Sequence, residues 1–276
     1  MRDLEALLDA GLDGLVIATP SAMHAEQAIT ALERGIAVFF QRPLARDAAE
    51  TRAVVEAARR ADQLLAIDFS YRFAGAVKAI ASIVRSGELG RLFGAELVFH
   101  NAYGPDKAWF RDRALSGGGC VIDLGIYLVD LLLWMLDFPQ VQAVDSRLFA
   151  RGERLPPSPE VVEDYAMATL ELAGGVFARM DCSWDHHAGR DADIRFGVFG
   201  TEGSVAVENV GGSFYGFAAY RRDGTRTQTL VEPPDDWGGR AAIDWAQRLT
   251  TSARFDERCR EAAAVADSLG RIYRGG

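Results

Sequence analysis

A long apolar run in the middle of the chain restricts the possible folds more than any other feature. Residues 120–136 are apolar almost throughout, and the run is long enough for a buried helix. Its clear polar exceptions, Asp123, Tyr127 and Asp130, fall on one stripe of such a helix. A buried carboxylate is costly unless it is paired or faces water, so this stripe is predicted to line a cleft. The alternative is that Asp123 caps a neighbouring backbone and Tyr127 only fills space.

Three consecutive glycines, Gly117, Gly118 and Gly119, come directly before this run. Glycine adopts backbone dihedral angles that other residues avoid, and it lets other groups approach the main chain closely. We therefore predict an unusual backbone at these positions and the close approach of a ligand.

Composition and charge exclude several classes of protein. The 276 residues carry a formal charge of −9, and phosphate binding needs a basic surface, so no nucleic-acid partner is expected. The run 126–138 is too short for a membrane span and contains Asp130, and Met1 to Gly14 show no secretion signal. Three cysteines without a C-x-x-C pair predict reduced thiols in a cytoplasmic protein. His186 and His187 are predicted to be surface residues, with no metal site.

The first part of the chain alternates between short apolar runs and helical patterns. Residues 15–18, 36–40 and 64–69 suit buried parallel strands, and helical segments separate them. This alternation is typical of βαβ units, so residues 1–70 are predicted to form an α/β unit with a parallel sheet. Loops after such strands lie where open α/β sheets bind ligands.

The second part, residues 71–276, is predicted to be an α+β domain with a large, mostly antiparallel sheet. Beyond the apolar helix several segments alternate between apolar and polar residues, and residues 164–184 predict a hairpin that turns at Gly174 and Gly175. A sheet of this kind packs one face on helices and leaves the other face available. Trp109 and Arg111, in the loop before the glycines, are predicted to contact a substrate, because an indole suits stacking on a sugar ring or a ring cofactor. Trp109 is equally explained as a packing anchor.

Two segments around the apolar helix resemble one family of enzymes. Residues 116–130, SGGGCVIDLGIYLVD, are similar to the motif GGG-x-x-x-D-x-G-x-H-x-x-D of the glucose–fructose oxidoreductase/inositol dehydrogenase/MocA family. Its members are NAD(P)-dependent dehydrogenases that act mostly on sugars and polyols. Tyr127 stands where the family has its catalytic histidine. Residues 70–73, SYRF, resemble the family's N-Y-R-F, where the chain passes from one domain to the other.

Two loops of the N-terminal unit resemble the same family. Residues 18–24, ATPSAMH, are similar to its A-T-P-x-x-x-H loop, which runs beside the nicotinamide cofactor. Gln41, Arg42 and Pro43 resemble E-K-P, whose lysine is catalytic. Arg42 therefore stands in place of that lysine.

The resemblance implies a fold, a cofactor and partners. Residues 1–70 are expected to be the second half of a Rossmann domain, and residues 71–276 a complete substrate-binding and oligomerisation domain. NAD or NADP is the implied cofactor, a sugar or polyol the implied substrate, and a homodimer or tetramer through the large sheet the implied assembly. The sequence contains no G-x-G-x-x-G segment to hold a pyrophosphate, so it is expected to begin midway through the cofactor domain. Cofactor binding by this chain alone is left open.

The resemblance also implies site residues, and simpler roles exist for several of them. The implied cofactor-binding residues are Thr19, Pro20, His24, Gln41 and Arg42. Tyr71 and Arg72 could hydrogen-bond a polyol or a cofactor, or they could brace the domain junction. Without the resemblance, His24 is explained by the first turn of a helix and Arg42 by an exposed turn.

The expected catalytic residues are Arg42, Asp123 and Tyr127. Arginine stays protonated at any working pH, so Arg42 can polarise a carbonyl or hold a carboxylate but cannot be the base. We hypothesise that its charge makes Tyr127 acidic enough to do the histidine's work. The alternatives are an inactive family member that binds a sugar-like ligand or a partner subunit, and a non-redox use of the same pocket such as elimination.

Overall fold

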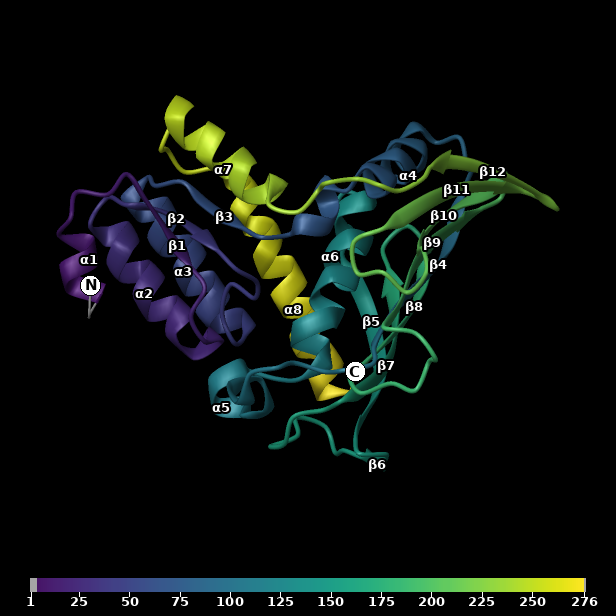
Figure 1. Cartoon of the computed structure of the whole chain (residues 1–276), viewed down its shortest axis with the longest axis horizontal. Coiled ribbons are helices and arrows are strands. Elements are labelled where there is room, and N and C mark those ends of the chain that lie inside the picture. Colours follow the sequence, from purple (N-terminus) through teal and green to yellow (C-terminus); the bar gives the residue numbers. More distant parts are fainter. Residues whose placement is uncertain (1–3, 276) are drawn as a thin grey trace.

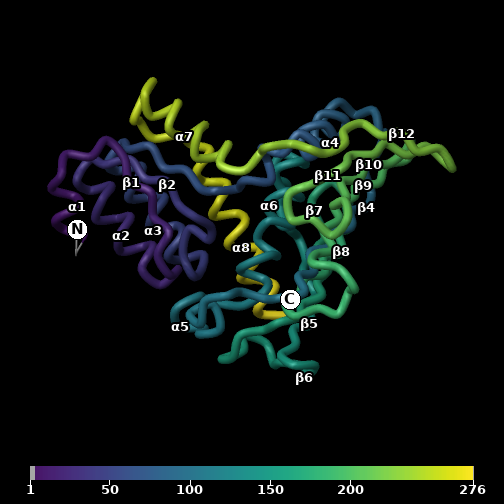
Figure 2. The backbone as a smooth tube through the Cα atoms, viewed as in Figure 1, coloured from purple at the N-terminus to yellow at the C-terminus, as the bar shows by residue number. Residues whose placement is uncertain are grey.

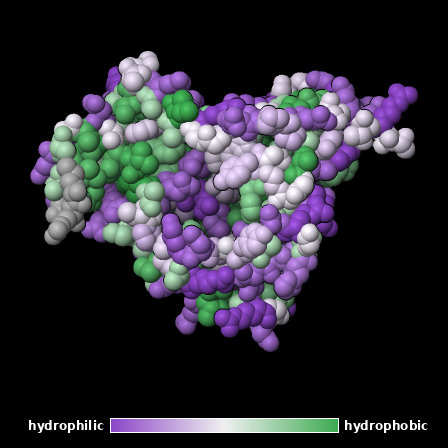
Figure 3. All heavy atoms as spheres, in the orientation of Figure 1, coloured by the Kyte–Doolittle hydropathy of each residue, from purple (hydrophilic) through white to green (hydrophobic). Residues whose placement is uncertain are grey.

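The computed structural model describes residues 4–275, and the first three residues of the segment Met1 to Gly14 lie outside that range. The described chain contains two sheets with helices between them (Figure 1). In the space-filling view a hollow with a largely hydrophilic surface lies between the two sheet-containing units (Figure 3). The α/β fold with one parallel and one mostly antiparallel sheet is confirmed.

The N-terminal unit is a three-stranded parallel sheet in the order β1-β2-β3. Its elements are α1 (Leu4–Leu8), β1 (Gly14–Ile17), α2 (Ser21–Glu33), β2 (Ala37–Phe40), α3 (Ala48–Ala61) and β3 (Leu65–Ile67). Strand β2 is buried at every position because it lies between the other two strands. The predicted βαβ arrangement is therefore confirmed, and all three strands end at the same edge of the sheet.

The second unit is a nine-stranded sheet in the order β12-β11-β10-β9-β4-β8-β7-β5-β6. Its strands are β4 (Leu92–Asn101), β5 (Val141–Ala150), β6 (Glu153–Arg154), β7 (Tyr165–Leu172), β8 (Phe177–Ser183), β9 (Ala192–Gly200), β10 (Gly203–Asn209), β11 (Phe217–Asp223) and β12 (Arg226–Val231). The predicted hairpin is formed by β7 and β8. One pair, β4 with β8, is parallel, which the sequence did not indicate.

The apolar run forms the central helix, which packs between the two units (Figure 1). It follows the short helix α5 (Arg113–Ser116), opens with a π-helical turn over Val121–Gly125 and continues as α6 (Ile126–Met135). The stretch Arg113–Met135 is apolar and long enough to cross a membrane by length and composition alone. However, 94% of its most apolar window is buried inside the protein, as in the core helix of a globular fold.

The three glycines before the π-helical turn are required by close contacts within the chain. Gly117 has a φ of 86°, which side-chain-bearing residues rarely adopt. A Cβ on Gly118 would lie 1.9 Å from Tyr273 Oη, and one on Gly119 would lie 1.9 Å from the carbonyl oxygen of Glu163. The unusual backbone is confirmed, but the groups that approach these glycines belong to the protein itself. Tyr273 and Glu163 fill the space at Gly118 and Gly119, while Gly117 lines a cavity, so the approach of a ligand there stays a prediction.

The helices after the large sheet return to the N-terminal unit, as the path of the chain in Figure 2 shows. Helix α7 (Arg240–Thr251), which the sequence analysis missed, packs Ala241 and Trp245 against Phe39 of β2. Helix α8 (Glu261–Arg274), which follows a 3-10 turn at Glu257–Arg260, lies against α3, α6 and β5. Helix α4 (Gly75–Ser86) covers the far end of the same face of the large sheet. The opposite face exposes apolar side chains such as Met167 and Phe177.

Candidate active site

Arg42 lies directly after strand β2 and reaches across to the central helix. Its Nε donates to Tyr127 Oη at 2.7 Å, and its Nη1 donates to Asp123 Oδ1 at 2.7 Å. Trp184, just after β8, donates from Nε1 to Asp123 Oδ2 at 2.9 Å. The Arg42 and Asp123 side chains are 16% and 10% exposed, so solvent reaches only the rim of the group. We call Arg42, Asp123, Tyr127 and Trp184 the Arg42 cluster; it contains all three residues predicted to be catalytic.

The charge state of this cluster follows from burial and from its neighbours. Burial lowers the pKa of Arg42, but Tyr127 and Asp123 together raise it by more than burial lowers it. The guanidinium therefore remains a cation. Burial raises the pKa of the Tyr127 phenol, Arg42 lowers it, and Asp68 and Asp123 raise it again. The net shift is upward: Arg42 lowers the pKa of this phenol, as the hypothesis requires, but burial raises it by more. Tyr127 is a neutral phenol at neutral pH, and its oxygen accepts from Arg42, which leaves its hydrogen free for another acceptor.

A second carboxylate, which the sequence analysis did not single out, lies beside the Arg42 cluster. Asp68 follows β3, and its backbone N–H donates to the Phe40 carbonyl oxygen at 2.8 Å, which places it next to Gln41 and Arg42. Burial raises the pKa of Asp68, while Arg42, Gln41 and Ser70 lower it, and the net shift is upward. The available signal was its position directly after a buried strand, at the edge where such sheets bind ligands.

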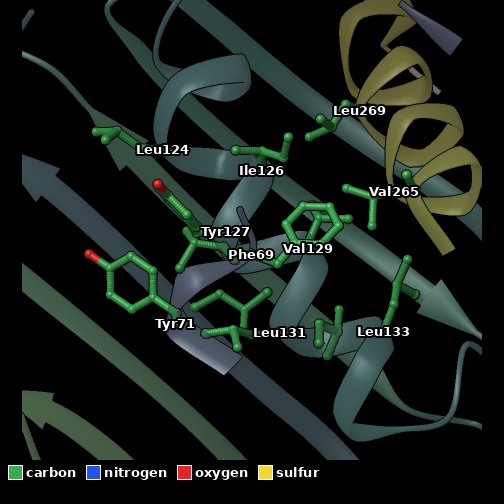
Figure 4. Packing of buried hydrophobic residues seen from close by; sticks show 14 of the residues in the cluster. Phe69, Tyr71, Leu124, Ile126, Tyr127, Val129, Leu131, Leu133, Val265 and Leu269 are labelled. Atoms are coloured by element: carbon green, nitrogen blue, oxygen red, sulfur yellow. The ribbon is translucent and has the colours of Figure 1, made fainter. Parts of the chain in front are cut away.

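Tyr71 lies beneath the Arg42 cluster rather than in it. Its ring is edge-on to Tyr127, with centroids 4.6 Å apart, and also contacts Phe217 and Trp237. Figure 4 shows the two tyrosine rings side by side with their hydroxyl groups directed to the same side. Tyr71 is buried, and burial raises the pKa of its phenol well above the ordinary value. This environment favours the bracing role over direct contact with a ligand.

Arg72 forms a separate group with two carboxylates. Its Nε and Nη2 bind the two oxygens of Asp130 at 2.9 and 2.5 Å, and its Nη1 binds Glu261 Oε2 at 2.5 Å. The guanidinium also lies over the rings of Phe69 and Trp134. Asp130 thus faces a different arginine from Asp123, although both lie on the central helix. We call Arg72, Asp130 and Glu261 the Arg72 cluster; its contacts favour a brace between α6, α8 and the N-terminal unit.

The predicted cofactor-binding residues lie at the carboxyl ends of β1 and β2. The His24 ring is 1% exposed and lies between two carbonyl oxygens, with Nε2 2.8 Å from Thr19 O and Nδ1 2.8 Å from Pro43 O. It therefore fixes the loop after β1 to the loop that carries Arg42. Burial lowers the pKa of His24 more than these two carbonyl groups raise it. Pro20 is the N-cap of α2, and Gln41 donates its backbone N–H to Ile17 O at 2.9 Å.

Of the two residues predicted in the loop before the glycines, Arg111 is linked to the site. Its Nη2 binds Asp185 Oδ2 at 2.9 Å, and its guanidinium lies 5.7 Å from the centre of the Trp184 ring. Trp109 stacks on Phe110 with ring centroids 3.8 Å apart. The loop therefore reaches the Arg42 cluster through Arg111 and Trp184, whereas Trp109 is a half-buried ring stacked on Phe110.

Histidine and cysteine side chains form pairs elsewhere. Among residues 4–275 no group of three or more His, Cys, Asp or Glu side chains is placed to hold a metal ion. His186 stacks on the His100 ring with centroids 4.2 Å apart. Cys120 and Cys182 are buried free thiols whose Sγ atoms lie 3.8 Å apart. None of these groups joins the Arg42 cluster.

Comparison with known proteins gives two family matches. Residues 1–69 match the oxidoreductase family with an NAD-binding Rossmann fold, and residues 77–206 match the GFO/IDH/MocA C-terminal domain. A solved structure, GenD2 from gentamicin A biosynthesis in complex with NAD, is similar to this chain with a TM-score of 0.81 and 25% identity. That similarity covers 100% of this chain and 79% of the GenD2 chain.

Two curated relatives are similar in sequence. The 1,5-anhydro-D-fructose reductase of Ensifer adhaerens is 31% identical over 75% of this chain and 60% of its own length. The putative UDP-kanosamine synthase oxidoreductase subunit of Amycolatopsis mediterranei is 32% identical over 83% of this chain and 68% of its own length. The chain thus spans about three fifths to two thirds of the length of these relatives. It belongs to the glucose–fructose oxidoreductase/inositol dehydrogenase/MocA family of oxidoreductases.

Proposed function

We propose that this chain is an NAD(P)-dependent oxidoreductase that transfers a hydride between nicotinamide and a carbinol carbon of a sugar or polyol. The observation that carries the proposal is the Arg42 cluster. A fixed cation and a neutral phenol lie together at the carboxyl edge of a parallel sheet, the place where such sheets bind ligands. Curated relatives include the Ensifer adhaerens 1,5-anhydro-D-fructose reductase, whose name supports a sugar-like substrate.

The residues at that edge fit the nicotinamide end of the cofactor. Helix α2 begins at this edge with Pro20 as N-cap, no side-chain cap and no acidic residue in its first turn, so its positive end is available to a polar ligand. Thr19, Pro20 and Gln41 would hold the cofactor there, with His24 fixing the two loops. Strand β1 has no neighbour on its other side among the described residues, so further strands can extend the sheet. When bound, nicotinamide supplies the hydride donor or acceptor.

The proton chemistry is assigned to residues of this chain. Arg42 stabilises negative charge on the substrate oxygen, because it remains a cation and its position is fixed by two hydrogen bonds. Tyr127 Oη donates its proton to that oxygen when a carbonyl is reduced, because the phenol is neutral and its oxygen already accepts from Arg42. The Asp68 carboxylate, beside Gln41 and Arg42, exchanges that proton with solvent. Asp123 orients Arg42 and stays out of the transfer.

The first test is nucleotide binding by this chain alone. NADH or NADPH at about 100 times its dissociation constant should raise the free energy of unfolding by about 2.7 kcal/mol, visible as a shift in melting temperature. Tyr127→Phe should retain that shift and lower turnover of a responsive aldose, ketose or polyol by roughly 100-fold or more. Tyr103→Phe is the matched control, because Tyr103 is exposed and its hydroxyl donates to Asp191, outside the Arg42 cluster.

Three outcomes separate the candidates. Nucleotide stabilisation together with a large loss of turnover in Tyr127→Phe supports the proposal. Full turnover in that variant removes Tyr127 from the mechanism. Stabilisation by a sugar but by neither nucleotide contradicts hydride transfer by this chain and favours the non-catalytic sugar-binding alternative.

We also propose the assembly, the domain boundary and the location. The exposed face of the large sheet, with Met167 and Phe177 on it, is the surface through which two or four copies associate, and light scattering of Phe177→Glu would test it.

The boundary between domains is placed at residues 70 and 71, where the 3-10 turn Ser70–Phe73 follows the N-terminal sheet. A reducing, cytoplasmic location is consistent with three free thiols, which thiol labelling of the cellular protein would test.

A further inference from the structure

A cavity of about 520 Å³ lies on the side of the central helix away from the Arg42 cluster. It is lined by the segment after β2, by the start of α3, by α5 and the π-helical turn, and by α8. Its volume is within the range of sites that hold small organic molecules. No residue assigned above to the cofactor or to the substrate lines the cavity. Two of its lining residues, Pro43 and Ile122, are the chain neighbours of Arg42 and Asp123.

One wall of the cavity is apolar. Phe69, Ile122 and Ile126 line it from one side, and Val265 and Leu269 of α8 line it from the other. Figure 4 shows Val265 and Leu269 facing Ile126 and Phe69. These side chains belong to the main hydrophobic core but leave this space unfilled. An apolar body of a ligand would therefore be favoured here, because it removes this surface from water.

The other wall carries an arginine whose hydrogen-bonding capacity is not used. Arg113 lines the cavity and stacks on the Tyr273 ring, with its guanidinium carbon 4.9 Å from the ring centre. The ring is fixed, because Tyr273 Oη donates to Glu163 Oε1 at 2.7 Å. Arg113 Nη1 is buried and has no hydrogen-bond partner in the described chain. Nη1 itself is shielded from the cavity, but the guanidinium has no ion pair within residues 4–275, so its other N–H groups are available to an anionic ligand.

The remaining charges around the cavity leave an excess of positive charge. Arg46 is paired with Glu50, and the Asp47 carboxylate accepts from the first backbone N–H groups of α3, Ala49 and Glu50. Arg274, at the end of α8, also lines the cavity and has no ion pair within residues 4–275. Arg113 and Arg274 are therefore the two charges left without a carboxylate partner.

We propose that this cavity binds a small organic anion, a carboxylate carried on an apolar aliphatic or aromatic body. The carboxylate accepts from the Arg113 guanidinium and faces Arg274, and the apolar body packs on Ile122, Ile126 and Leu269. Pro43 and Ile122, which line the cavity, directly adjoin Arg42 and Asp123 in the chain. A ligand in the cavity therefore contacts the two segments that carry Arg42 and Asp123, on the side away from the Arg42 cluster.

The test uses three probes on the whole chain without any nucleotide. Benzoate has the charge and the apolar body, benzamide has the body without the charge, and inorganic phosphate has charge without the body. Isothermal titration should give saturable binding of benzoate at one site, at least about tenfold tighter than benzamide or phosphate. The δ-methyl resonances of Ile122 and Ile126 should shift with benzoate, while that of the exposed Ile243 should not.

Variants then locate the site. Arg113→Met keeps the length of the side chain without its charge and should weaken benzoate by about tenfold or more. Arg226→Met, at an exposed arginine of β12, is the matched control and should bind as the native chain does. Ala266→Phe fills the cavity from α8 and should abolish binding even if Arg113→Met fails to fold.

The proposal is overturned if benzoate binds no tighter than benzamide to the native chain. It is also overturned if benzoate binds equally well to Ala266→Phe, since the ligand would then lie elsewhere. The result is independent of hydride transfer, because no step of the test requires a nucleotide or turnover.

Discussion

Asp123 and Asp130 lie on the same side of the central helix, and each pairs with an arginine that follows a strand of the N-terminal sheet. Arg42 and Arg72 thus make the same kind of contact from neighbouring positions. The two clusters differ in what surrounds the pair. The Arg72 cluster adds a second carboxylate, Glu261, and the Asp130 side chain is only 2% exposed. The Arg42 cluster adds a neutral phenol and an indole N–H, and it reaches solvent at its rim.

This difference shows why an arginine–carboxylate pair alone does not identify an active site. In the Arg72 cluster all three guanidinium nitrogens bind carboxylate oxygens of the protein, so the cluster joins elements. In the Arg42 cluster the proton of Tyr127 is not used by the bond with Arg42. A transferable proton beside a fixed cation is the feature that makes the second arrangement chemically useful.

The largest effect should come from breaking the Arg72 cluster. Arg72→Met leaves Asp130 buried without a partner, so we expect the free energy of unfolding to fall by about 3–5 kcal/mol in urea titrations. Arg72→Met combined with Asp130→Leu should recover most of this loss, because no buried charge remains. A loss below about 1 kcal/mol in the single variant would show that the pair is screened by water and would bring Arg72 back as a ligand-binding candidate.

A smaller loss of stability is expected at the Arg42 cluster. Arg42→Met leaves Asp123 bonded to Trp184 and partly in contact with water, so the free energy of unfolding should fall by about 1–3 kcal/mol. Turnover should fall by about 100-fold or more, since the fixed cation is lost. Arg42→Lys should restore stability better than turnover, because an ammonium group cannot reproduce two fixed hydrogen bonds. Equal losses of stability in Arg42→Met and Arg72→Met would erase the distinction between the clusters.

The sequence predicted the positions of the main elements because their patterns are local. The buried helix, the three parallel strands and the hairpin of β7 and β8 all follow from apolar periodicity and turn residues. The family resemblance brought Arg42, Asp123 and Tyr127 together, although 81 and 85 residues separate Arg42 from its two partners.

What could not be predicted depends on packing between distant segments. Asp68 was missed because its neighbours come from another loop, and its position after a buried strand does not by itself show which groups surround it. The direction of the Tyr127 pKa was wrong because the sequence shows the nearby cation but not the extent of burial, which outweighs it. The glycines were predicted to admit a ligand, but the sequence could not show that Tyr273 and Glu163 occupy that space.

Removal of the indole donor should have a moderate effect on the Arg42 cluster alone. Trp184→Phe keeps an aromatic ring but removes the bond to Asp123 Oδ2, at a cost of about 1 kcal/mol in unfolding free energy. Asp123 would then be held by Arg42 only, so turnover should fall while the Arg72 cluster is unaffected. The check is a double-mutant cycle with Arg42→Met, in which the two losses should not add. Additive losses would show that Trp184 and Arg42 act independently on Asp123.

The smallest effect is expected from Asp68, the titratable group at the edge of the Arg42 cluster. Burial raises its pKa in the folded chain above the value in the unfolded chain, so the folded state binds the proton more tightly. Its contribution to stability is therefore present at acid pH and is lost as the pH rises through the folded pKa. Asp68→Asn is neutral at every pH. The difference in free energy of unfolding between this variant and the native chain should therefore favour the variant slightly more at pH 7 than at acid pH. Urea titrations over a series of pH values measure this difference.

The same substitution should slow turnover, because the carboxylate that exchanges a proton with solvent is removed. A variant that gains stability at neutral pH and loses activity would show that the protein retains an unfavourable buried carboxylate for its chemistry. If Asp68→Asn instead loses stability at pH 7 as Arg72→Met does, Asp68 belongs with Asp130 and Glu261 as a bracing carboxylate. The difference between the Arg42 cluster and the Arg72 cluster would then depend on Tyr127 alone.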